Sequence, residues 1–233
     1  MDLRPRQHRA STRNADACRS QPGEIANSGY LTLALFLGEY AQAEASSTRT
    51  IELAKKDRLP NPAARARTVL GLARADLGHA DEGVALIEQG LSELQKMGTR
   101  MGITQTIARL AEAQALAGRL QEAFQSVEIG LQTLPDERLF RPPLLRLRGE
   151  LWLKQCQLAE AEADLRESMT EAQGMSAKAW ELQATTRLAR LFASQGKRDQ
   201  ARAMLKEIYS WLTEGFDTAD LKNAKALLDE LRS

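Results

Sequence analysis

The amino-acid sequence predicts an all-α solenoid of about five helix-turn-helix repeats, with a period of about 40 residues, followed by a C-terminal capping helix. A glycine or cysteine recurs at intervals of 40, 40, 38 and 40 residues, at Gly38, Gly78, Gly118, Cys156 and Gly196. Apolar residues around these positions recur in steps of three and four, which define one face of an α-helix. The chain also holds 36 Ala and 35 Leu among 233 residues but only 5% aromatic residues, which is typical of closely packed helices.

Small residues recur around each of these positions, and they predict where two helices cross. In the second repeat they are Gly71, Gly83 and Gly90. Antiparallel helices approach closely only where their side chains are small. At the turn itself, glycine lets the chain leave the first helix in a left-handed conformation. Cys156 occupies the turn position of the fourth repeat, where we expect a buried small side chain.

We expect three parts along the chain. Residues 1–23 hold five Arg and few apolar residues, and they predict a disordered basic leader. Residues 24–216 form the repeat array, and residues 217–233 form the capping helix. The five repeats are expected at about 24–58, 61–98, 99–135, 136–174 and 176–214.

Two features of the N-terminal region have alternative interpretations. The leader is either a solvated segment without a role, which we prefer, or a tether to nucleic acid or to a membrane surface. The apolar run from Tyr30 to Leu37 resembles a secretory signal, but it lies in register with the repeats.

The composition argues against several functional classes. The 32 Lys+Arg and 31 Asp+Glu leave a net charge of +1, and the leader carries the positive excess, so the array is slightly acidic. Broad nucleic-acid binding needs a basic surface. No apolar run approaches the ~20 residues of a membrane span. The only cysteines, Cys18 and Cys156, are typical of a reducing compartment, and we expect a cytoplasmic protein.

We find no catalytic constellation in the sequence and expect a protein that is not an enzyme and holds no cofactor. His8 and His79 are too few and too far apart to predict a metal site. His79 is interpreted as a solvated loop residue, because no Ser or Cys nucleophile has a positioned base. The three Trp are expected to pack rather than to form a ligand cage, with Trp180 the most exposed.

Leu70-Gly71, Gly78, Gly83, Ile87 and Gly90 resemble a tetratricopeptide repeat (TPR), although 40 residues exceed the usual ~34 of that family. The resemblance implies a right-handed superhelix with a concave groove. Residues 176–231 more specifically resemble the C-terminal TPR array of bacterial proteins that fuse a class III adenylate/guanylate cyclase domain, or a transcriptional regulator, to a predicted ATPase. Because the cyclase and ATPase motifs are absent, this chain would carry only the sensor or interaction array. It would be either a stand-alone protein or the remnant of a longer gene.

In TPR arrays the first helix of each repeat lines the concave groove. The resemblance places ten side chains there: Arg65, Thr68, Asp76, Gln105, Glu112, Arg146, Glu150, Lys154, Gln183 and Arg190. Their mixed charge suits a peptide or helix of mixed sign. The asparagine positions of the family's carboxylate clamp hold other residue types, which disfavours a binder of C-terminal carboxylates.

The leading hypothesis is a non-enzymatic protein–protein interaction scaffold, the sensor or interaction part of a bacterial signalling system. A cyclase or ATPase domain is a candidate partner, and neither nucleic acid nor a membrane is expected to be one. The alternatives are a small-ligand-sensing regulatory module, an enzyme of nucleotide cyclisation or hydrolysis, and an RNA-binding helical repeat. The acidic array argues against the last of these.

Overall fold

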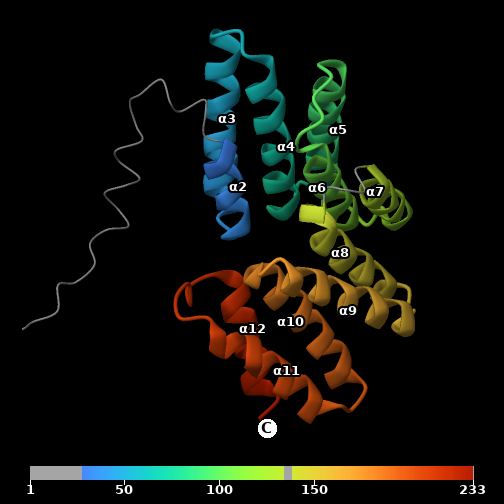
Figure 1. Ribbon diagram of the computed structural model, residues 1–233. Helices are drawn as coiled ribbons and strands as arrows, with labels where there is room; N and C mark the ends of the chain where they lie inside the picture. The colour runs from blue at the N-terminus through green and yellow to red at the C-terminus, as the bar shows by residue number, and fades with distance from the viewer. Residues whose placement is uncertain (1–27, 134–137, 233) are drawn as a thin grey trace, which may run out of the picture.

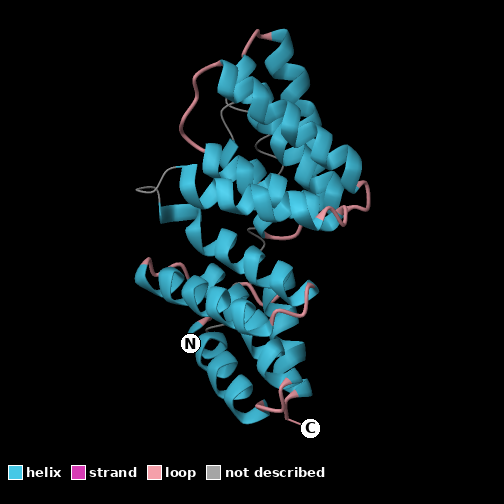
Figure 2. Ribbon diagram, turned by 90° about the vertical axis from the view of Figure 1, so that its right-hand side faces the viewer, coloured by secondary structure: helices cyan, strands magenta, loops and turns pink. Residues whose placement is uncertain are grey.

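The computed structural model describes residues 28–133 and 138–232, and all regular elements among them are helices (Figures 1 and 2). The helices form antiparallel pairs: α2 (Ser28–Phe36) with α3 (Tyr40–Lys56), α4 (Pro60–Asp76) with α5 (Ala80–Lys96), α6 (Ile103–Leu116) with α7 (Leu120–Thr133), α8 (Arg141–Lys154) with α9 (Leu158–Gly174), and α10 (Lys178–Ser194) with α11 (Arg198–Trp211). A short 3₁₀-helix, η2 (Arg138–Phe140), precedes α8, and α12 (Ala219–Glu230) follows the last pair. The predicted fold class is confirmed. The domain boundaries stay a prediction, and the leader of residues 1–23 lies outside the described residues.

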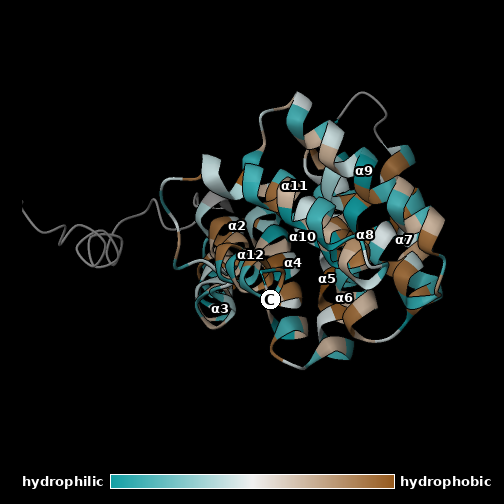
Figure 3. Cartoon of the chain, turned by 90° about the horizontal axis from the view of Figure 1, so that it is seen from below, coloured by the Kyte–Doolittle hydropathy of each residue, from teal (hydrophilic) through white to brown (hydrophobic). Residues whose placement is uncertain are grey.

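The array is curved because the first helices of successive pairs pack on one another. Helix α2 contacts α4, α4 contacts α6, and this continues through α8 and α10 to α12. The curvature brings α10 and α12 next to the end of α2 (Figures 1 and 3). A Cβ atom built on Gly38, in the α2–α3 turn, would lie 3.4 Å from the Cβ of Ala219 in α12. The two ends of the array therefore meet.

Helices α4 and α5 cross with their backbones in direct contact. A Cβ atom on Gly71 would lie 2.6 Å from the carbonyl oxygen of Gly83, and one on Gly83 would lie 2.4 Å from the carbonyl oxygen of Gly71. No side chain fits at such a distance, so glycine is required on both helices. This crossing lies at the small residues that the repeat pattern singles out.

The turns within the pairs adopt the left-handed conformation that their glycines predict. Gly78, for example, has a φ of +96°, and Cys156 at the equivalent position has a φ of +59°. The prediction that Cys156 is buried is wrong, because its side chain is exposed. A Cβ atom on Gly78 or Gly196 would meet nothing within 4 Å. The turn position therefore requires a backbone conformation and not a small packed side chain.

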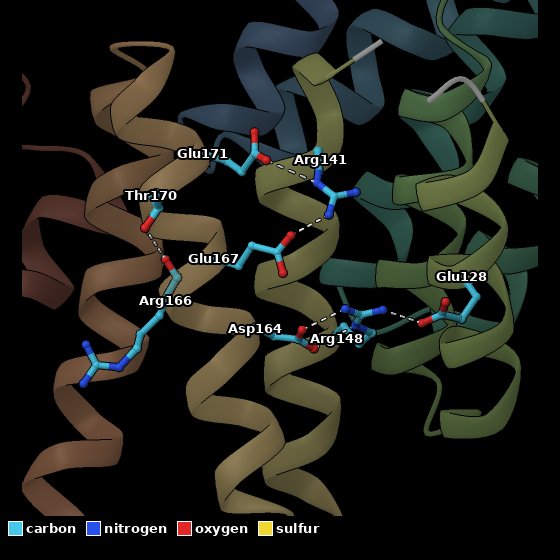
Figure 4. Close-up of polar contacts among 8 residues, drawn as sticks. All are labelled: Glu128, Arg141, Arg148, Asp164, Arg166, Glu167, Thr170 and Glu171. Atoms are coloured by element: carbon cyan, nitrogen blue, oxygen red, sulfur yellow. Dashed lines mark hydrogen bonds and ion pairs between the residues drawn. The ribbon is translucent and has the colours of Figure 1, made fainter. Parts of the chain in front are cut away.

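Ion pairs on α8 hold the middle of the array together (Figure 4). Arg148 forms a bidentate pair with Asp164 of α9, with Nε–Oδ2 and Nη2–Oδ1 distances of 2.7 and 2.8 Å, and its Nη1 lies 2.6 Å from Oε1 of Glu128 on α7. Asp164 also accepts a hydrogen bond of 3.1 Å from the indole of Trp152. Bidentate pairs of this kind fix the geometry of the elements that they join.

Apolar side chains fill the space between the inner and outer helices along the whole array. Val84 and Ile87 of α5 and Leu188 and Phe192 of α10 are among the fully buried residues. Among the residues that the structure describes, no helix is both long and apolar enough to cross a membrane.

Candidate functional site

A cavity of about 270 Å³, which we call the axial cavity, lies where the first helices of the array and α12 come together. Its wall is built from α2, α3, α4, α6, α8, α10 and α12, with one residue from η2. The charged residues of the wall are Asp76, Arg109, Glu112, Arg146, Arg187 and Asp220. Because the ends of the array meet at this cavity, residues far apart in the sequence share one site.

Arg109 of α6 is the most deeply buried of these charges, with 7% of its surface exposed. Its Nη1 donates a hydrogen bond of 3.0 Å to the hydroxyl of Thr68, and its Nη2 donates one of 2.8 Å to the hydroxyl of Thr32. Burial, together with the nearby charge of Arg65, lowers the pKa of Arg109 to about 10. Within the described part of the chain, Arg109 forms no ion pair. Its hydrogen-bond acceptors there are two neutral hydroxyls, and the charge of Glu112, three residues further on, also favours its charged form.

Two further arginines of the wall share one carboxylate. Oε1 of Glu150 lies 2.5 Å from Nη1 of Arg146 and 2.7 Å from Nε of Arg187. Burial opposes the charge of Glu150, but the two guanidinium groups outweigh it and lower the pKa of the carboxyl group. Burial also opposes the charge of Arg146, and Glu150 and Glu112 raise its pKa in turn. This network joins α8 to α10 and carries its own counter-charge.

Acidic side chains gather on α4, α6 and α12. Asp76 interacts by a side-chain hydrogen bond with Tyr40, and burial, followed by the charge of Glu112, raises the pKa of Asp76 to about 7. Burial also raises the pKa of Glu112, although Arg146 opposes this shift. Asp220 accepts a hydrogen bond of 2.7 Å from the amide of Gln183. The pKa of Asp76 therefore lies near neutral pH.

Three aromatic rings form the apolar part of the wall. The ring centroids of Phe36 and Trp180 lie 6.4 Å apart, and those of Phe140 and Trp180 lie 6.1 Å apart. The prediction that Trp180 is the most exposed tryptophan is wrong, because it is half-buried where α2 and η2 meet α10, whereas Trp211 is 60% exposed. The sequence pattern of one repeat does not show this contact between distant repeats.

Five of the ten side chains that the resemblance places in the groove line the axial cavity: Asp76, Gln105, Glu112, Arg146 and Gln183. Two more contact residues of the wall but do not line the cavity themselves. Thr68 accepts the hydrogen bond of Arg109, and Glu150 bridges the two arginines.

The last three lie away from the cavity. Arg65 donates to the carbonyl oxygen of Met101, Lys154 donates to the carbonyl oxygen of Ala115, and Arg190 is exposed on α10. A binding role for any of the ten stays a prediction.

Arg109 and Arg187 line the cavity and are absent from the predicted set. Both stand nine positions before a turn glycine, at Gly118 and Gly196, so the repeat register contains a signal for them. Tyr40 and Asp220 also line the wall. Their places depend on the meeting of the two ends, which the register of a single repeat does not reveal. No group of three or more His, Cys, Asp or Glu side chains in the described residues could hold a metal ion.

No protein-family model and no curated protein matches this sequence. Solved structures of helical repeats are similar to it. BtubC (BKLC) from P. vanneervenii is 18% identical, with a TM-score of 0.61 over 83% of this chain and 89% of that one. A putative kinesin light chain with nearly identical TPR-like repeats from Podosopora anserina is 18% identical, with a TM-score of 0.55 over 82% of this chain and 96% of that one. A point variant of the same repeat protein is 17% identical, with a TM-score of 0.56 over 82% and 96%. The chain therefore has the TPR-like fold.

Proposed function

We propose that this chain is a non-enzymatic TPR-type scaffold for protein–protein interaction, which binds a segment of a partner at its concave side. One observation carries this proposal. Every first helix of the array and α12 contribute side chains to one cavity, where paired and unpaired charges stand beside aromatic rings. Such a wall offers directed polar contacts and apolar area, as binding sites for proteins and small molecules do.

We also propose that the chain has no catalytic activity. The cavity wall carries arginines, carboxylates, amides and aromatic rings, and several of its polar groups, such as Arg146 and Asp220, are engaged in structural hydrogen bonds and ion pairs. His79 is exposed at the α4–α5 turn and does not line the cavity. Incubation of the purified chain with ATP or GTP and Mg²⁺ is expected to give no cyclic nucleotide and no phosphate above the buffer control. Turnover that co-purifies with the chain through two chromatographic steps would refute this part.

We further propose that the chain serves a bacterial signalling system in the cytoplasm. The resemblance of residues 176–231 to cyclase–ATPase fusion proteins supports this, and the scarcity of cysteine supports the location. A cyclase or ATPase domain is the candidate partner. The near-zero net charge supports a protein partner rather than nucleic acid.

Binding of purified full-length cyclase–ATPase relatives to the immobilised chain tests the scaffold. Arg187→Gln, in the cavity wall, is the test variant, and Arg202→Gln, exposed on the outer helix α11, is its control. We expect the wild type and Arg202→Gln to retain a relative that Arg187→Gln loses, with equal circular dichroism for all three. Equal retention by the two variants would contradict a concave binding site.

A small-ligand-sensing module is the second candidate, and the size of the cavity favours it. About 270 Å³ is just below the ~300–1,000 Å³ typical of pockets for small organic ligands. A ligand there would contact both ends of the array at once, so its binding would favour the closed arrangement of the helices. A ligand that binds only the folded state raises the melting temperature. A thermal-shift screen of metabolites tests this candidate, and a screen without any shift would contradict it.

A further inference from the structure

One cationic group of the axial cavity forms no ion pair among the described residues, although the charge of Glu112 acts on it. Arg146 and Arg187 share Glu150, whereas Arg109 donates only to the hydroxyls of two threonines. Arg109 is 7% exposed, and its side chain lines the cavity. A buried charge is costly unless an opposite charge pairs with it. The cavity beside Arg109 is therefore a favourable place for an anionic group.

Negative charge that the neighbouring arginines balance only in part lies in the same cavity. Asp76 forms no ion pair within the described residues and interacts with the hydroxyl of Tyr40. Glu112 lies 3.7 Å from Arg146, and its side chain is 41% exposed. Glu112 follows Arg109 by three residues on α6, which places their Cβ atoms about 5–6 Å apart. Arg109 and Glu112 form no ion pair with each other, so an ammonium group beside Asp76 and Glu112 would lie about one helical turn from a carboxylate beside Arg109.

The remaining chemistry of the wall is apolar. Phe36, Phe140 and Trp180 form a chain of ring contacts, and Leu35 and Leu72 lie on the same wall. Phe36 is 45% exposed, so its ring has free surface for a ligand to cover. An apolar group that covers these rings gains the free energy of removing both surfaces from water.

We propose that the axial cavity binds a free α-amino acid with an apolar side chain. Its carboxylate pairs with Arg109, and its ammonium group lies between Asp76 and Glu112. Its side chain packs against Phe36 and Trp180. This inference rests on the small-ligand candidate under the proposed function, and it names the chemical class of that ligand.

Other ligand classes fit the wall less well. A phosphate or a dicarboxylate would face Asp76, Glu112 and Asp220, while only Arg109 is free of a carboxylate partner within the described residues. Only part of a peptide of several residues fits within about 270 Å³, and an internal peptide unit carries neither terminal charge. A zwitterion of one residue matches both charges and the volume.

Isothermal titration calorimetry of the full chain at pH 7, where the α-ammonium group of an amino-acid amide (pKa about 7.7–8.0) is still mostly charged, tests the inference. The probes are L-leucine, L-phenylalanine, L-tryptophan and L-glutamate, with N-acetyl-L-leucine and L-leucine amide as the analogues that lack one charge. We expect at least one apolar amino acid to bind, and each analogue to bind about tenfold or more weakly, because a buried charge is then left without its partner. Leucine amide binding as tightly as leucine would overturn the role of Arg109.

Variants locate the site. Asp76→Asn and Arg109→Gln are each expected to weaken binding of the amino acid about tenfold or more, and Phe36→Ala is expected to weaken it less. Arg202→Gln, on the outer helix α11, is the exposed control and should bind as the wild type does. Because Arg109 is buried, circular dichroism and the melting temperature of each variant are measured first. Asp76→Asn provides an independent test if Arg109→Gln does not fold.

The result also distinguishes this inference from the proposed function. The chain could retain a cyclase–ATPase relative and yet give no heat with any amino acid up to about 10 mM, a concentration at which even millimolar binding is seen. That result would overturn the inference but would not contradict the scaffold function. Binding of a leucine-ended decapeptide as tightly as free leucine would likewise overturn it, in favour of a peptide site. Heat from an apolar amino acid that is lost in Asp76→Asn and kept in Arg202→Gln supports the inference, whether or not a protein partner is retained.

Discussion

The rings of Phe36 on α2 and Trp180 on α10 lie with their centroids 6.4 Å apart and their planes at 51°. This contact joins the first helix pair to the fifth, across the axial cavity. Tilted aromatic pairs contribute about 0.5–1.5 kcal/mol beyond the area that they bury. The contact is thus one of the few interactions that hold the array in its closed form.

Phe36→Ala is expected to lower the free energy of unfolding by roughly 1–2 kcal/mol and to increase the radius of gyration. The reason is that the substitution removes the ring contact between the two ends. Urea denaturation and small-angle X-ray scattering measure the two effects. Leu33→Ala, on the same helix and 51% exposed, is the control and should leave both values unchanged. Equal effects of the two substitutions would argue against a closed array.

Gly83→Ala is expected to destabilise the protein by about 1–3 kcal/mol, because its new Cβ would lie 2.4 Å from the carbonyl oxygen of Gly71. Helices α4 and α5 must then move apart. Gly174→Ala is the matched control, since a Cβ there meets nothing within 4 Å. It should be neutral, or stabilise by up to about 1 kcal/mol. Chemical denaturation compares the two, and a Gly83→Ala variant as stable as the control is the contradictory result.

Asp164→Asn is expected to cost roughly 1–3 kcal/mol of stability, because it leaves Arg148 with the half-exposed Glu128 as its one carboxylate partner among the described residues. The substitution removes the bidentate partner of Arg148 in a site where Asp164 is only 6% exposed. Glu162→Gln, on the same helix in a surface pair with Arg166, should cost about 0.5 kcal/mol or less. Urea midpoints of the two variants test this difference. Comparable losses of stability would show that the Arg148–Asp164 pair stabilises the fold no more than a surface pair does.

Asp76 gives the stability of the protein a defined pH dependence. Its pKa is about 7 in the folded protein against an ordinary value of 3.8 for an unperturbed carboxyl group, so the folded state binds more protons between these values. Stability must therefore fall as the pH rises from about 4 to about 7 through this group. Asp76→Asn should reduce that fall, and Glu112, whose pKa is also raised, accounts for part of what remains. Urea midpoints measured at about pH 4.5, 6 and 7.5 span this window. A variant with the pH dependence of the wild type would contradict the assignment.

The fold could be predicted from the sequence because its determinants are local. A left-handed turn requires glycine or a tolerant residue, and a close crossing requires small side chains, so both recur in the sequence with the period of the repeat. The burial of Cys156 could not be predicted in this way. A glycine recurs at this position because the turn needs a left-handed backbone, but a recurring glycine could equally indicate a small side chain packed in the core.

The candidate site could be predicted only in part. Residues such as Glu112 and Arg146 follow from the register of one repeat, because they lie on the inner face of a first helix. Tyr40 and Trp180 enter the wall because small rotations between successive pairs add up until the ends meet. These rotations depend on packing between repeats, and no local pattern encodes their sum.

The central claim is that the two ends of the array meet around the axial cavity, and a cross-link tests it most directly. In a background with Cys18→Ser and Cys156→Ser, Gly38→Cys is combined with Ala219→Cys. The Cβ separation of 3.4 Å is close to the ~3.5–4.5 Å that a disulfide requires. Gly78→Cys with Ala219→Cys is the control, because Gly78 occupies the same left-handed turn position in the next pair and has nothing within 4 Å. The structure predicts that mild oxidation closes an intramolecular disulfide in the first pair and not in the second, seen as a mobility shift of the monomer that reductant reverses. Failure of the first pair to cross-link, or equal cross-linking of both, would contradict the closed array.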